Sequence, residues 1–205
     1  MLVYQNCVRG QHLRVIISPY GENVCRLSRT QKGKKDLSDA KAYRQISIGS
    51  LENWVLERIF LERLDPYLNV HDCQMGYKKN HSTSHAIEIV RNIERTMDAH
   101  VCLLDASAAF DNLSWSRIRD QLIKRKLPPT LIKLVLTQIC SNRIRVCGEA
   151  EFYPRAGVKQ GGILSGKLFA TCYDDLISLL YKTGVGVLLS VFYYVLLFTP
   201  TTFYY

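Results

Sequence analysis

Apolar residues recur at helical spacing in several stretches of the chain. The segment 51–65 follows Ser50, a residue type that favours the N-cap, and ends before Pro66, which breaks helices. Its apolar residues share one broad helical face: Val55, Leu56, Ile59, Phe60 and Leu64. The segment 86–97 repeats this spacing and predicts a second helix.

Three more helices are predicted further along the chain. Ser114 can cap one that ends before Pro128, and Thr130 can cap another that runs to about Ile139. A last helix is predicted over 168–180, after a glycine-rich stretch.

Strand patterns are fewer. The short apolar run Val101–Leu104 stops at Asp105, which predicts a buried strand with an acid at its end. Residues 143–147 alternate polar and apolar before a glycine turn, which is typical of a hairpin. Residues 1–30 show no sustained period and stay unassigned. Helices and strands that mix without strict alternation predict an α+β domain.

The end of the chain is apolar and uncharged. The run Val185–Phe198 is shorter than the roughly 20 residues that a membrane helix needs, which favours buried strands. The alternative is a membrane anchor, with the aromatic residues 203–205 at the interface.

Charge and cysteine content indicate the class of partner and the cellular compartment. The 205 residues carry 27 Lys and Arg against 18 Asp and Glu, a net charge of +9. Residues 26–44 hold seven of these cations and two acids, which indicates a phosphate-bearing partner; a solvated basic loop is the alternative. The seven scattered cysteines form no C-x-x-C pair, so we expect an intracellular, reducing compartment, nuclear or cytoplasmic.

Two stretches carry candidate chemistry. Asp105 and Asp111 could hold Mg2+, which prefers carboxylate oxygens. The alternative places Asp105 in a loop and Asp111 near a helix start, where the helix dipole favours an acid. The glycines of 157–166 surround Gln160 and let the backbone lie flat against a ligand; a plain turn between a hairpin and a helix is the alternative.

Four strings, in this order, resemble the reverse transcriptase domain of non-LTR retrotransposons: AYRQISI, GYKKNHST, LLDASAAFD and GVKQGGILSGKLF. The family's strings read roughly NYRPISL, GFRKGRST, FLDFSKAFD and GVPQGSILGPLLF. The resemblance runs from about Lys32 to about Thr201.

The resemblance implies roles for individual residues. Asp105 matches the palm aspartate that binds both catalytic Mg2+ ions, and Phe110 matches the aromatic residue that lies against the incoming sugar. Lys35 and Arg44 match fingers residues near the triphosphate. Asp111 belongs to the motif as a structural residue. The loop that packs against the template and the incoming nucleotide is matched by Gln160, Gly161 and Gly162.

The chain also departs from the family strings at individual positions. Gln45, Lys159 and Gly166 replace prolines of the family strings. The tail VFYYVLLFTPT aligns with YADDVVLLAPT, so that Tyr193 and Tyr194 stand where the second and third metal-binding aspartates are expected. Residues 173–175 read Tyr-Asp-Asp, but they lie in a helical stretch, and we expect a solvated helix face there.

The resemblance implies the fingers and palm of a right-hand polymerase, truncated and without a thumb. Residues 31–100 would form the fingers-like part and 101–205 an incomplete palm-like part. The implied activity is RNA-directed DNA synthesis by two-metal nucleotidyl transfer, with Mg2+, an RNA template, a DNA primer and deoxynucleotides.

The missing aspartates predict a partial or degenerate copy with little or no activity. The alternatives are a catalytically dead remnant that binds nucleic acid and a small membrane-anchored protein, the less favoured of the two. No specific protein partner is indicated.

Overall fold

A computed structural model describes most of the chain after residue 42 and several strands before it. The described residues are 3–8, 11–16, 23–29, 43–96, 98, 106, 108–146, 150–183, 187–189 and 192–194, with side chains over 46–96, 98, 106, 108–144 and 153–183. The predicted strand Val101–Leu104, Asp105 and Lys35 lie outside these residues.

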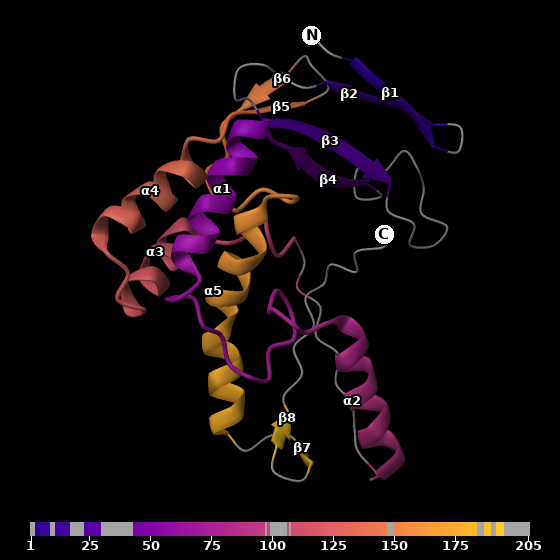
Figure 1. Ribbon diagram of the computed structural model, residues 1–205, viewed down its shortest axis with the longest axis vertical. Coiled ribbons are helices and arrows are strands. Elements are labelled where there is room, and N and C mark those ends of the chain that lie inside the picture. The colour runs from indigo at the N-terminus through magenta and orange to yellow at the C-terminus, as the bar shows by residue number, and fades with distance from the viewer. Residues whose placement is uncertain are drawn as a thin grey trace.

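Helices dominate the described structure. They are α1 (Leu51–Leu64), α2 (Thr83–Thr96), α3 (Trp115–Lys124), α4 (Pro129–Cys140) and α5 (Ile163–Lys182). Helices α1 and α5 pack against each other, and α3 contacts both α4 and α5. In Figure 1, α3 and α4 lie on one side of α5 and α2 lies on the other.

A four-stranded sheet lies at one end of α1 (Figure 1). Its order is β4 (Tyr43–Ile48), β3 (Asn23–Arg29), β5 (Ile144–Val146) and β6 (Ala150–Phe152). Strand β3 is antiparallel to β4 and parallel to β5, so the sheet joins segments that lie far apart in the sequence.

Two further strand pairs are antiparallel hairpins. Strands β1 (Val3–Val8) and β2 (Gln11–Ile16) form the first, and β7 (Val187–Leu189) and β8 (Phe192–Tyr194) form the second. The first thirty residues, which had no predicted element, therefore hold three strands. In the part of the chain that the structure describes, no helix is both long and apolar enough to cross a membrane.

Two of the three predicted helix caps are confirmed. Ser50 accepts a hydrogen bond from the Asn53 N–H at 3.3 Å, and Ser114 accepts one from the Arg117 N–H at 3.5 Å. The predicted Thr130 cap is wrong because α4 already begins at Pro129, whose fixed φ suits the first helical position. The predicted hairpin over 143–147 is confirmed by the β5–β6 pair.

The core gathers beneath α1, α3, α4 and α5. Its most deeply buried apolar side chains are Leu64, Leu68, Ile118, Leu122, Val135, Leu168 and Ile177. The apolar face predicted for α1 is only partly used, since Phe60 and Leu64 are buried while Val55 and Ile59 are exposed. The buried face of α1 is narrower than the predicted apolar face, because α5 covers only one side of α1.

The neighbours Leu122 and Ile123 on α3 test this core. The Leu122 side chain is 0% exposed and the Ile123 side chain 55% exposed. We expect Leu122→Ala to lower the free energy of unfolding by about 2–5 kcal/mol, because it leaves a cavity. Ile123→Ala should change it by about 0.5 kcal/mol or less. Urea titration followed by circular dichroism measures both, and equal losses would contradict the assignment.

Candidate nucleotide and template site

The glycine-rich loop, residues 157–162, is bound to the segment 108–115 by three hydrogen bonds. The Gly157 N–H donates to the Leu113 carbonyl at 2.8 Å, and the Val158 N–H donates to the Phe110 carbonyl at 3.0 Å. The indole N–H of Trp115 donates to the Gly157 carbonyl at 2.7 Å. These bonds bring the third and fourth of the family-like strings together.

Gly157 is required by this close approach. Its φ is +84°, in the left-handed region, and a Cβ there would lie 2.7 Å from the Asp111 carbonyl oxygen and 2.9 Å from the Phe110 carbonyl oxygen. Both the backbone conformation and the contact therefore exclude a side chain.

The other end of the loop is bound to β4. The Ser47 N–H donates to the Gln160 carbonyl at 2.8 Å. Gly161 has a φ of +103°, and a Cβ there would lie 2.9 Å from the Ser47 carbonyl oxygen. Strand β4 also carries Arg44, which pairs with Ser28 of β3 in the sheet register; its side chain is not among those described. The first string thus meets the same loop.

A buried carboxylate connects the loop to two helices. Glu57 of α1 accepts hydrogen bonds from the Ile163 N–H at 2.8 Å and the Leu164 N–H at 3.4 Å, the first residues of α5. Its other oxygen forms an ion pair with the Lys159 ammonium at 2.5 Å. The N-cap of α5 is Gly162, which has no side chain, so Glu57 provides the acceptor that a capping side chain supplies elsewhere.

Phe110 lies in a row of aromatic rings. It stacks on Phe169 with ring centroids 4.9 Å apart and meets the edge of Tyr77 at 6.3 Å. The Phe110 side chain is 6% exposed. Tyr77 belongs to the second string, and its ring lies against Gly166. Glycine is needed at 166 because a Cβ there would overlap the Tyr77 ring. All four strings therefore meet around Phe110 and the loop, and the role of Phe110 toward a sugar stays a prediction.

The proposed metal ligands are only partly described. Asp105 lies outside the described residues, and Asp111 is exposed, although nearby protein atoms partly desolvate its carboxyl and raise its pKa. Tyr193 and Tyr194 lie in β8, opposite Leu188 and Val187. Among the described residues, no three side chains of His, Cys, Asp or Glu lie together.

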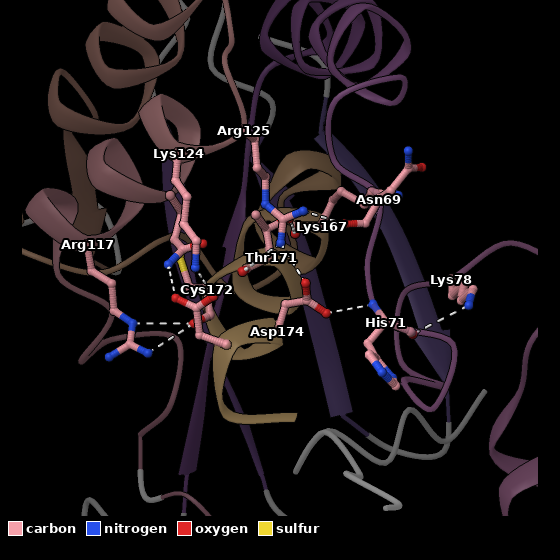
Figure 2. Close-up of polar contacts among 12 residues, drawn as sticks. Asn69, His71, Lys78, Arg117, Lys124, Arg125, Lys167, Thr171, Cys172 and Asp174 are labelled. Atoms are coloured by element: carbon pink, nitrogen blue, oxygen red, sulfur yellow. Dashed lines mark hydrogen bonds and ion pairs between the residues drawn. The ribbon is translucent and has the colours of Figure 1, made fainter. Parts of the chain in front are cut away.

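The Tyr-Asp-Asp sequence at 173–175 lies within α5, as the sequence pattern indicated. Asp174 accepts the His71 N–H at 2.6 Å and pairs with Arg125 at 2.8 Å (Figure 2). Asp175 accepts the Gln121 amide at 2.6 Å and pairs with Lys124 at 2.6 Å.

The expected solvated helix face is therefore wrong for Asp174, whose side chain is 14% exposed. The two carboxylates serve packing, because they fasten α5 to α3 and to the segment around His71.

Sequence reasoning missed Glu57, although a signal was present. Glu57 lies three residues before Phe60 and seven before Leu64, on the same helical face as these two buried residues. A lone acid on an apolar helical face indicates a buried partner, because an unpaired buried charge is costly.

Comparison with known proteins identifies the class. Residues 32–195 match the family model described as reverse transcriptase (RNA-dependent DNA polymerase). The chain therefore belongs to the reverse transcriptase family, and its fold is that of a polymerase of this family.

Two curated relatives place it among non-LTR elements. The chain is 30% identical over 162 residues to the "Retrovirus-related Pol polyprotein from type-1 retrotransposable element R2" of Popillia japonica, an alignment that covers 74% of this chain and 23% of that protein. It is also 30% identical over 144 residues to the "Retrovirus-related Pol polyprotein from type-2 retrotransposable element R2DM" of Drosophila melanogaster. That alignment covers 66% of this chain and 14% of that protein. The chain thus spans less than a quarter of the length of these relatives.

Substitution of Gly157 tests the loop. We expect Gly157→Ala to lower the free energy of unfolding by about 2 kcal/mol or more, because it combines a left-handed backbone with a steric overlap. Gly49→Ala is the matched control, since Gly49 is exposed and is not among the described glycines with positive φ. The account fails here if both variants unfold at the same urea concentration.

The pairing of Asp175 predicts a pH dependence. The hydrogen bond from Lys124 lowers the pKa of the Asp175 carboxyl, so the folded state favours the charged form. The stability that this group contributes is present above its unfolded pKa of about 3.9 and is lost as the pH falls through the lower folded value.

Asp175→Asn should therefore cost about 0.5–1 kcal/mol at pH 7, a small value because the pair is half exposed. The difference should shrink as the pH falls below the unfolded value of about 3.9 and through the lower folded pKa. Asp120→Asn is the control, because among the described residues Asp120 pairs with its neighbour Arg119 on the same helix and joins no second element. A difference that persists unchanged at low pH would argue that the charge of Asp175 contributes nothing.

Proposed function

We propose that this chain is the nucleotide- and template-binding part of an RNA-directed DNA polymerase from a non-LTR retrotransposon, and that it polymerises little or not at all. The observation that carries the proposal is the convergence of the family-like strings on one loop. The hydrogen bonds from Ser47, Gly157 and Val158 bring the first and third strings to the loop, and the Tyr77 ring brings the second against Phe110 and Gly166. Its partners would be an RNA template, a DNA primer and deoxynucleotides, as suits a chain with a net charge of +9.

The proposed division is a fingers-like part over 31–100 and a palm-like part over 101–205. The contacts from β4 and α1 to the loop support a site at the boundary of these parts. Gln160, Gly161 and Gly162 would present backbone to the base pair that forms, since two of the three lack a side chain. Lys35 and Arg44 would offset the charge of the triphosphate.

Phe110 would limit the space beside the sugar. Its ring contacts both Phe169 and Tyr77 and its side chain is buried, so it has little freedom to turn aside. A side chain fixed in this way can exclude a 2′-hydroxyl by steric contact, which is the role that the family resemblance gives it.

Reverse transcriptases generally use divalent metal ions, and Mg2+ with Asp105 as its ligand is part of this proposal. A two-metal site needs several carboxylates to hold both ions. Tyr193 and Tyr194 are phenols with a reference pKa of about 10, which makes them poor ligands for a hard cation at neutral pH. Retained binding with lost catalysis is therefore the function that these residues support best.

The direct test is primer extension on an RNA template with Mg2+. We expect the unmodified chain to extend no more primer than Asp105→Ala, because the aligned doublet supplies no carboxylate. The double variant Tyr193→Asp/Tyr194→Asp should raise the rate above this background. Extension by the unmodified chain that Asp105→Ala abolishes would contradict the proposal.

Two controls sharpen this experiment. Binding of the primed template, measured by fluorescence anisotropy, should weaken about tenfold or more between about 50 mM and 200 mM salt, since phosphate contacts release counterions. Asp174→Asn/Asp175→Asn should leave extension by the repaired chain unchanged, because both carboxylates are engaged within the helical packing.

A further inference from the structure

Lys159 replaces a proline in the family's glycine-loop string, and its ammonium reaches the carboxylate of Glu57. We propose that Glu57 and Lys159 are positioning residues, which hold the loop 159–162 in the orientation that receives the template and the nucleotide. This inference rests on the proposed function of that loop.

The pair is built into the protein interior. Lys159 Nζ lies 2.5 Å from Glu57 Oε1, and the side chains of Lys159 and Glu57 are 7% and 4% exposed. A buried carboxylate persists only if its oxygens are satisfied, and Glu57 meets this condition with the ammonium and two backbone N–H groups of α5. Displacement of any one partner would leave a buried charge incompletely paired.

The loop backbone packs closely against the pair. A Cβ at Gly162 would lie 3.2 Å from the Glu57 carboxylate, 3.0 Å from Lys159 Cγ and 2.6 Å from Ser165 Oγ. Two residues earlier in the loop, the Gln160 carbonyl accepts the Ser47 N–H at 2.8 Å. The loop is therefore held on both sides of Gln160, by the ion pair at Lys159 and by the close contact of Gly162.

A proline restricts a loop through its own ring, whereas Lys159 restricts it through a contact with a different element. In this chain the loop position thus depends on α1. Helix α1 follows directly on β4, which carries Arg44, so the ion pair couples the segment proposed to meet the triphosphate with the segment proposed to meet the template.

Trp115 provides a natural reporter of the loop. Its indole N–H donates to the Gly157 carbonyl at 2.7 Å, at the other end of the loop from the ion pair. The chain has two tryptophans, so Trp54→Phe leaves Trp115 alone. All variants below are made in that background.

The test compares Lys159→Met with Lys167→Met. Lys167 also joins α5 to α1, through Asp65 at 2.9 Å, but that pair lies away from the loop and Asp65 is 63% exposed. In folded protein, Lys159→Met should shift Trp115 emission to longer wavelength and increase its quenching by acrylamide. It should also weaken binding of the primed template with deoxynucleotide roughly tenfold. Lys167→Met should leave emission and affinity unchanged.

A double variant, Glu57→Gln/Lys159→Met, separates positioning from stability. It removes both charges, so its unfolding midpoint should recover part of what Lys159→Met loses. Its Trp115 emission and its affinity should stay altered, because the link between loop and α1 is still absent. If Lys159→Met does not fold, the double variant carries the comparison with Lys167→Met.

Two results would overturn the inference. One is a folded Lys159→Met protein with the parent's emission and the parent's affinity, and the other is full recovery of both in the double variant. If the parent itself binds no primed template, the proposed function fails, and the emission of Trp115 still decides whether the pair fixes the loop.

Discussion

The carboxylate of Glu57 is the buried charge around which the site is organised. It lies on α1, yet its hydrogen-bond partners are the first two N–H groups of α5 and the ammonium of Lys159. A buried anion without partners costs far more than an exposed one, so α1, the glycine-rich loop and α5 are stable together or not at all. The N–H groups at the start of a helix also favour an anion, which strengthens the same arrangement.

The second constraint is the close approach of backbone to backbone. Gly157 lies against the carbonyls of Phe110 and Asp111, and Gly161 lies against the carbonyl of Ser47. These contacts join segments that belong to different strings of the reverse transcriptase family, and they leave no space for side chains. The loop is thus held at both ends by hydrogen bonds and at Lys159 by the ion pair. A rigid loop of this kind is what template-directed selection of a nucleotide requires.

Several features that depend on neighbouring residues were predictable from the sequence, although the local β1–β2 hairpin and the start of α4 were not. Ser50 and Ser114 cap their helices because a cap is a contact over three residues, and the β5–β6 hairpin follows from local alternation. Strand β3 was missed because its partners, Ile48 of β4 and Val146 of β5, lie far along the chain. Glu57 carried a local signal, its place on the buried face with Phe60 and Leu64, but its partners begin at Lys159 and only the structure identifies them. The family resemblance pointed to the four strings. It could not give the role of Asp174, because the ion pair of this acid with Arg125 is visible only in the packed structure.

Native-state hydrogen exchange of three amides tests the central claim, that the first, third and fourth strings form one cooperative site around the loop. The Ser47 N–H joins the first string to the loop, the Val158 N–H joins the loop to the third string, and the Gly157 N–H donates to Leu113, two residues beyond that string. They should exchange with the same free energy as the Leu168 amide in the middle of α5, and urea should lower all four together. Fast exchange at Ser47, at the rate of the exposed Gly49 amide, while Leu168 stays protected, would contradict the claim.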